Sequence, residues 1–145
     1  MPVDRHAEEF LPLSDAAAEA LDHSWAAGEL HGHAERVLGF VVRHRDEILR
    51  LAGDSPTEHT LLEATRQLIA QVGTVHAPSE MQDQMQAIRD EIWIRGERGD
   101  YDRENIASDW TSQHAANWRR WRVAEYLIVV DRCAENIVQC LRVER

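Results

Sequence analysis

The chain has 145 residues, of which 43% are hydrophobic and 29% charged, a balance typical of a folded globular domain. Its formal net charge of −10 disfavours binding to nucleic acid or to an anionic membrane surface, because both repel an acidic protein. Its sixteen Lys and Arg residues are all arginines, which excludes lysine Schiff-base and P-loop chemistry.

A stripe of apolar positions at alternating spacings of three and four predicts a long first helix, which Ser14 caps and Gly53 ends. Two members of the stripe are histidines, His23 and His44. A break near Gly28–Gly32 would divide this helix, because glycine costs about 1 kcal/mol relative to alanine in a helix. The stripe consists of Leu13, Ala16, Ala20, His23, Ala27, Leu30, Ala34, Val37, Val41, His44, Ile48 and Leu51.

Two shorter helices are predicted next. Residues 55–58 have the pattern of a capping box with proline at the first helical position, and the helix they begin extends to about Val72. Residues 79–82, which follow Pro78, have the pattern of a second capping box, and the helix they begin ends at Gly96 or Gly99. Its apolar residues have four-three-four spacing and are Met81, Met85, Ile88 and Ile92.

From residue 101 to residue 145 there is no glycine or proline, which predicts a long last helix that Asp100 or Asp102 caps and that extends to about Val143. Its apolar residues form two faces that point in nearly opposite directions. The early face is Ile106, Trp110, His114, Trp118 and Trp121, and the later face is Val123, Leu127, Val130, Ala134, Ile137 and Leu141. Each apolar face must pack against a partner, and one of the two partners can be the core of the bundle. We predict that the other is a second subunit, so that the chain is a homodimer or a subunit of a larger assembly.

The sequence has no alternating pattern that would indicate a strand. We therefore predict an all-α fold, an antiparallel helical bundle of four main helices, or five if the first long helix breaks near Gly28–Gly32. The first and last helices are the long ones. Residues 1–145 are predicted to form a single domain, with residues 1–12 as an N-terminal tail.

The early face of the last helix is the first candidate site. Spacings of four, four and three place Trp110, His114, Trp118 and Trp121 on one side of a helix, with Arg119 and Arg122 beside them. Such a surface suits a subunit interface, a packed core or a pocket for a planar ligand. We favour the interface. Arginine interleaved with tryptophan is compatible with nucleic acid, but the acidic net charge favours cation–π pairs and salt bridges to a neighbouring acidic helix instead.

The histidines are the second candidate site. His23 and His44 are 21 residues apart, which places them about 32 Å apart along an unbroken helix. If the helix breaks, they could approach each other, with His31 and His33 at the break and Glu47 beside His44. Iron, zinc or haem could then bind to these side chains. A histidine in a helical seam is, however, more often hydrogen-bonded in the core. No cofactor is therefore firmly predicted.

Catalytic motifs are missing from the sequence, which contains no G-x-G-x-x-G, P-loop or G-x-S-x-G pattern. Cys133 and Cys140 are seven residues apart, too far along a helix for a disulfide between them. We therefore predict a non-catalytic interaction or accessory protein, with a metal- or haem-binding bundle as the first alternative. A small enzyme that uses His114 as a base is the second. The polar N-terminus and the short longest apolar run, residues 126–130, predict a cytoplasmic protein without a membrane partner.

Overall fold

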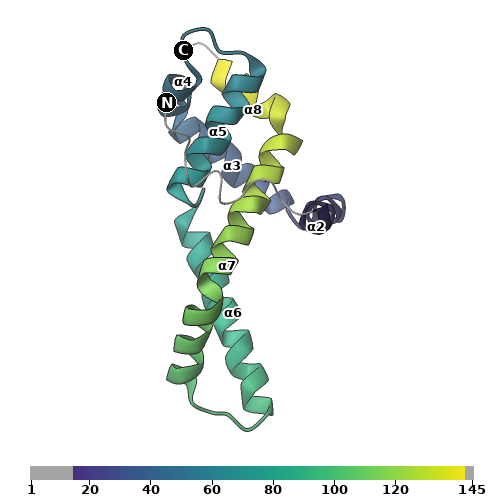
Figure 1. Cartoon of the computed structure of the whole chain (residues 1–145), viewed down its shortest axis with the longest axis vertical. Coiled ribbons are helices and arrows are strands. Elements are labelled where there is room, and N and C mark those ends of the chain that lie inside the picture. The colour runs from purple at the N-terminus through teal and green to yellow at the C-terminus, as the bar shows by residue number, and fades with distance from the viewer. Residues whose placement is uncertain (1–14, 143–145) are drawn as a thin grey trace. The chain divides into compact units, whose positions relative to one another are not determined.

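The computed structural model describes residues 15–142, in which all regular elements are α-helices (Figure 1). The prediction of an all-α fold is therefore confirmed. The predicted tail, residues 1–12, and the predicted cap Ser14 lie outside the described residues. The described chain forms two compact units: one extends to Val75 and resumes at Arg122, and the other is His76–Trp121.

The described residues form seven helices, so the predicted number of four or five was too small. The first unit contains α2 (Asp15–Ala26), α3 (His31–Arg43), α4 (Arg45–Ala52), α5 (Glu58–Val72), the end of α7 (Arg103–Arg132) and α8 (Ala134–Arg142). The second unit contains α6 (Ala77–Glu97) and the start of α7. Whether the helices form the predicted antiparallel bundle is not decided by these bounds and stays a prediction.

The predicted break in the first long helix is confirmed between α2 and α3. Gly28 has a φ of 82°, the left-handed conformation that glycine adopts without steric cost. A second interruption falls at His44, which has a φ of −110° and a ψ of 21°. It is milder, because the amide of His44 still donates to the carbonyl of Phe40 and the amide of Ile48 to that of His44. The break at Cys133 between α7 and α8 keeps the same two types of hydrogen bond.

Two glycine substitutions test this account of the break. Gly28→Ala is expected to lower the free energy of unfolding by about 1 kcal/mol, because alanine is strained at positive φ. Gly32→Ala is expected to raise it by about 0.5–1 kcal/mol, because Gly32 lies within α3 and its surroundings leave space for a methyl group. Urea denaturation measures both, and equal effects of the two substitutions would contradict the assignment.

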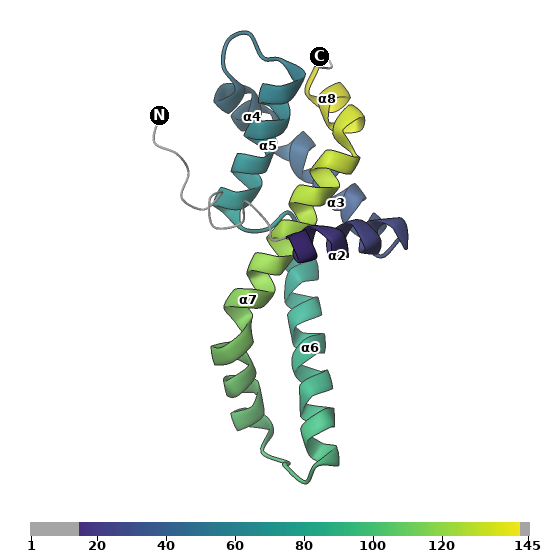
Figure 2. The ribbon, with the colours of Figure 1, turned by 45° about the vertical axis from the view of Figure 1, so that its right-hand side comes forward.

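The core of the first unit lies between α3, α4, α5, α8 and the end of α7, with α4 packed on α5 and α8 packed on α3 and α5 (Figure 2). The later face of the last helix is confirmed as core: apart from half-buried Ala134, its members are buried. The apolar stripe of the first helix is confirmed only from Leu30 onward. In α2 the described positions of that stripe are exposed, and Leu21 is buried instead.

The helix starts differ in part from those predicted. The cap of α5 is Thr57, which exchanges hydrogen bonds with Thr60 in a capping box that begins two residues after Ser55. The cap of α6 is His76, whose Nδ1 accepts from the amide of Ser79, so the box predicted at Ser79 was wrong. Asp102 does precede α7 as predicted, and its carboxylate accepts from the amide of residue 105.

The second unit is a helical hairpin in which α6 and the start of α7 lie side by side (Figures 1 and 2). The turn between them contains Gly99, whose φ is 92°. Ile106 and Trp110 are the buried apolar side chains among the described residues of the hairpin. This is a small core for 46 residues, since a helix pair has a single layer of contacts.

Candidate functional site

The predicted tryptophan face is divided by the structure. Trp110 is buried in the hairpin, with its ring 6.1 Å from that of His114. His114 and Trp121 are exposed, and Trp118 is half-buried. Of the two arginines predicted beside this face, Arg119 belongs to the hairpin and Arg122 to the first unit. The face is thus partly core and partly surface, a combination that the sequence pattern did not distinguish.

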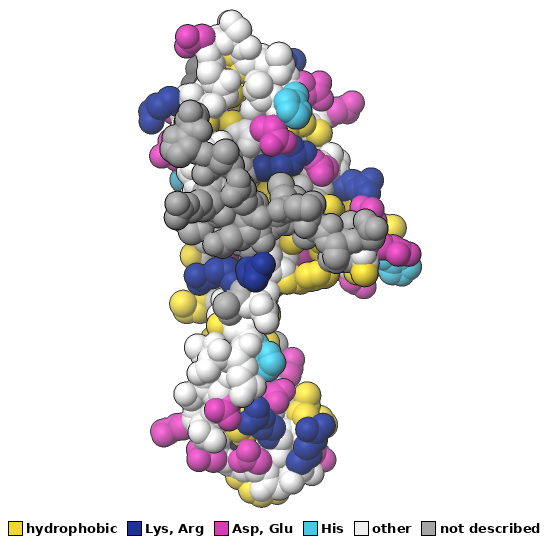
Figure 3. Space-filling view, in the orientation of Figure 1, with side chains coloured by type: hydrophobic (Ala, Val, Ile, Leu, Met, Phe, Trp, Pro, Cys, Tyr) yellow, Lys and Arg dark blue, Asp and Glu magenta, His cyan; other side chains and the backbone are white. Residues whose placement is uncertain are grey.

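Exposed apolar side chains are concentrated in the hairpin. Among the described residues, eight large hydrophobic side chains are exposed, and six of them belong to the hairpin although it forms less than half of the chain. The six are Met81, Met85, Trp93, Ile94, Tyr101 and Trp121. Apolar side chains gathered in this way on one element mark an interaction site more often than scattered ones do. On the face in Figure 3, acidic and basic side chains lie interspersed over the hairpin.

Ion pairs join the two helices of the hairpin. Arg95 of α6 donates to Glu91 at 3.0 Å and to Asp109 of α7 at 3.3 Å, and these hydrogen bonds raise the pKa of Arg95. Buried Glu80 of α6 pairs with Arg119 of α7, with 3.7 Å between the carboxylate and Nε. Because polar groups occupy the side of α6 that faces α7, much of the apolar stripe of α6 is left at the surface.

A groove lies where α6 meets the turn that follows it. Its volume is about 600 Å³, and two of its walls are the exposed aromatic side chains of Trp93 and Tyr101. Its other lining residues are Arg89, Ile92, Gly96, Glu97, Asp100 and Arg103. This groove was not predicted from the sequence. The available signal was Trp93, which directly follows the last member of the four-three-four stripe.

Among the described histidines of the first unit, His33 is the one that is buried. Its Nε2 lies 3.3 Å from the Arg122 guanidinium and 3.5 Å from the Glu125 carboxylate, and its ring meets that of Tyr126 edge-on. Nε2 thus lies between the guanidinium, which only donates, and the carboxylate, which accepts. The other ring nitrogen, Nδ1, is buried and has no hydrogen-bond partner among the described residues. Sequence reasoning missed Glu125, whose only signal was its position one turn after Arg122.

The other predicted metal ligands lie in separate surroundings. His23 is exposed in α2, and His31 stacks edge-on against Trp25. His44 lies 3.5 Å from Glu47, as their spacing on one helix face predicts, and its ring packs on Phe40. Within residues 15–142, no group of three or more His, Cys, Asp or Glu side chains is arranged to hold a metal ion. Metal binding therefore stays a prediction without a structural contact in its favour.

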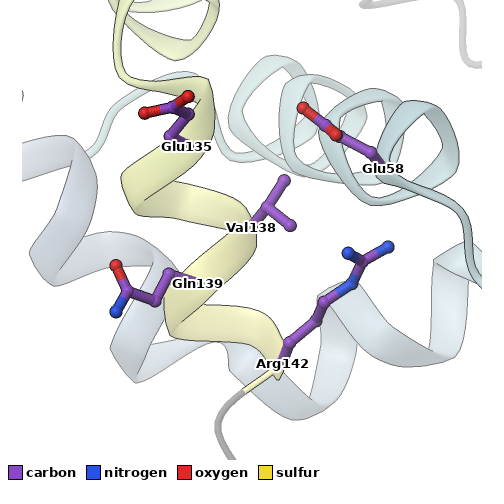
Figure 4. A pocket seen from close by; sticks show the side chains of 5 residues that line it. All are labelled: Glu58, Glu135, Val138, Gln139 and Arg142. Atoms are coloured by element: carbon purple, nitrogen blue, oxygen red, sulfur yellow. The ribbon is translucent and has the colours of Figure 1, made fainter.

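A second hollow, of about 430 Å³, lies between α8 and the start of α5 (Figure 4). The figure shows Arg142 and Glu58 on its two sides, with Val138 between them. No side chain that lines it is a typical nucleophile. Cys133 and Cys140 are free thiols, and burial raises the pKa of Cys133, which keeps it in the unreactive thiol form.

No protein-family model, curated protein or solved structure matches the chain. Among the helices described here, none is both long enough and apolar enough to cross a membrane.

Proposed function

We propose that the chain is a non-catalytic interaction protein that assembles through its hairpin, residues 76–121, as a homodimer or as a subunit of a larger assembly. The observation that carries this proposal is the concentration of exposed apolar side chains in the hairpin. A partner that covers these side chains would stabilise the complex by about 25 cal/mol for each Å² of apolar surface removed from water. A cytoplasmic location, expected from the sequence, is part of the same proposal.

The small core of the hairpin supports the same proposal. Among the described side chains of the hairpin, two buried apolar ones are few for 46 residues, and helix pairs usually gain their stability by packing an apolar face against further helices. A partner that covers the hairpin would supply this missing layer. The mixture of charges on the hairpin suits a protein partner better than nucleic acid, which requires a positively charged surface.

Removal of two tryptophans tests this proposal. The double substitution Trp118→Ala and Trp121→Ala is expected to reduce the oligomer to a monomer at micromolar concentration, because large aromatic side chains contribute most to interfaces. Light scattering measures the mass, and far-UV circular dichroism checks that the helices remain. Trp25→Ala, in the first unit, is the matched control and is expected to leave the mass unchanged. A parent protein that is strictly monomeric would overturn the proposal.

A further inference from the structure

We infer that the partner of the hairpin is a second copy of this chain, and that the two copies join through the apolar stripe of α6. This stripe consists of Met81, Met85, Ile88 and Ile92. The inference rests on the proposed role of the hairpin in assembly and adds to it the surface and the occupant. Two hairpins joined in this way form a four-helix bundle.

The stripe is exposed because of how α6 packs. Met81 is 69% exposed and Met85 46%, and Ile88 and Ile92 are half-buried. The positions that directly precede the stripe residues are Glu80, Gln84, Ala87 and Glu91. They lie about 100° around the helix from the stripe and are buried or half-buried. The hairpin thus buries the polar flank of α6 more deeply than its two methionines, an arrangement that needs a further partner on the stripe.

The spacing of the stripe is symmetric, which suits a second copy. Read from either end, its intervals are four, three and four. In an antiparallel pair, a two-fold axis between Met85 and Ile88 therefore places Met81 opposite Ile92 of the partner copy and Met85 opposite Ile88. A closed dimer uses the same patch on both subunits, so a patch of this kind must be self-complementary.

The shape of α6 is also self-complementary. Met81 protrudes near one end of the stripe, and the groove of about 600 Å³ lies at the other end, where Ile92 is one of its walls. Antiparallel pairing brings the methionine of each copy to the groove of the other. The aromatic walls of the groove, Trp93 and Tyr101, are suitable neighbours for a methionine, because thioether sulfur contacts aromatic rings favourably.

The charges around the stripe allow two copies of an acidic protein to approach. The positions that directly follow the stripe residues form its outer flank and are Gln82, Gln86, Arg89 and Trp93, of which only the arginine is charged. On the inner flank, Glu80 is paired with Arg119 and Glu91 with Arg95. Like-charge repulsion between the copies is therefore small at this surface, despite a net charge of −10 for each chain.

The area available fits a reversible dimer. The 21 residues of α6 span about 30 Å, and two helices side by side are about 20 Å wide, which gives a face of roughly 600 Å² on each copy. Stable interfaces cover about 800 Å² on each partner. We therefore expect a dimer that dissociates on dilution rather than an obligate one.

A matched pair of substitutions on full-length protein tests the inference. Met81→Asp is expected to raise the dissociation constant of the dimer at least about 10-fold, because it removes a methionine that the dimer would bury and brings a carboxylate into the apolar interface. Gln82→Asp adds the same side chain one position further along, on the outer flank, and is expected to change the constant less than about 3-fold. Both native residues are exposed, so both variants should fold. Sedimentation velocity over a range of concentrations measures the constant.

The outcomes separate this inference from the proposed function. A dimer that Met81→Asp weakens and Gln82→Asp does not supports both. An oligomer that resists Met81→Asp but dissociates when Trp118 and Trp121 are removed overturns the stripe as the contact and leaves the proposed function standing. A larger oligomer that Met81→Asp leaves intact also overturns the inference. A monomeric parent protein overturns both.

Discussion

Replacing Phe40 with alanine is expected to lower the free energy of unfolding by about 3–5 kcal/mol, the largest loss that we expect from a single substitution in this chain. Phe40 is 1% exposed in α3, and its ring lies 4.3 Å from that of His44. Alanine would remove the burial of an aromatic ring and leave a cavity where α3 meets the rest of the core. Urea denaturation followed by circular dichroism measures the loss.

The matched control for Phe40→Ala is Val42→Ala. Val42 lies two residues later in α3 and is 53% exposed, so its truncation removes little buried surface and leaves no cavity. We expect a change within about 0.5 kcal/mol. A loss below about 1 kcal/mol for Phe40→Ala, or equal losses for both variants, would show that Phe40 does not occupy the core position described here.

The second large effect is expected from Arg122→Met, which should lower the free energy of unfolding by about 2–3 kcal/mol. The side chains of Arg122 and Glu125 are 11% and 15% exposed, and both contact His33. Methionine preserves much of the packing of the aliphatic part but leaves the carboxylate and the imidazole without the guanidinium. The cost is that of keeping poorly paired polar groups away from water.

A double-mutant cycle separates this pairing from simple packing. In the Glu125→Gln background, Arg122→Met is expected to cost less, because the amide no longer leaves a buried negative charge unpaired. Arg119→Met is the control: its pairing with Glu80 engages a side chain that is 65% exposed, where screening by solvent makes an ion pair weak. Identical costs for Arg122→Met in both backgrounds would contradict the ionic role of the cluster.

The helices were predicted from the sequence more successfully than the candidate functional sites were. The same is true of core positions on a helix face that is apolar throughout. The residues from Val123 to Val130 are apolar on nearly all sides, and the structure buries six of the eight. Gly28 was predictable as a break because a positive φ favours glycine. In α2, however, five of the twelve residues are alanine, and alanine fits both core and surface. The periodicity there placed His23 on the buried side, whereas the structure exposes it.

The two candidate sites were harder to predict because they depend on contacts between distant segments. His33 lies off the predicted stripe, and its surroundings come from Arg122 and Glu125, which follow about 90 residues later. In the hairpin, periodicity identified apolar positions on both helices but not which of them face each other. Arg95 pairs with Asp109 and Glu80 with Arg119 between the helices, and the pattern of apolar residues contains no information about such pairs.

These ion pairs also mark the side of α6 that faces α7. Glu80 with Arg119 and Arg95 with Asp109 join α6 to α7 at two separate levels along the helices. A slip of one helix by a single turn, about 5.4 Å, would separate both pairs at once. The stripe and most of the groove lie on α6 itself, so their spacing is fixed by that helix. A surface that must match its own copy also needs α6 to keep one side toward α7, and the two pairs lie on that side.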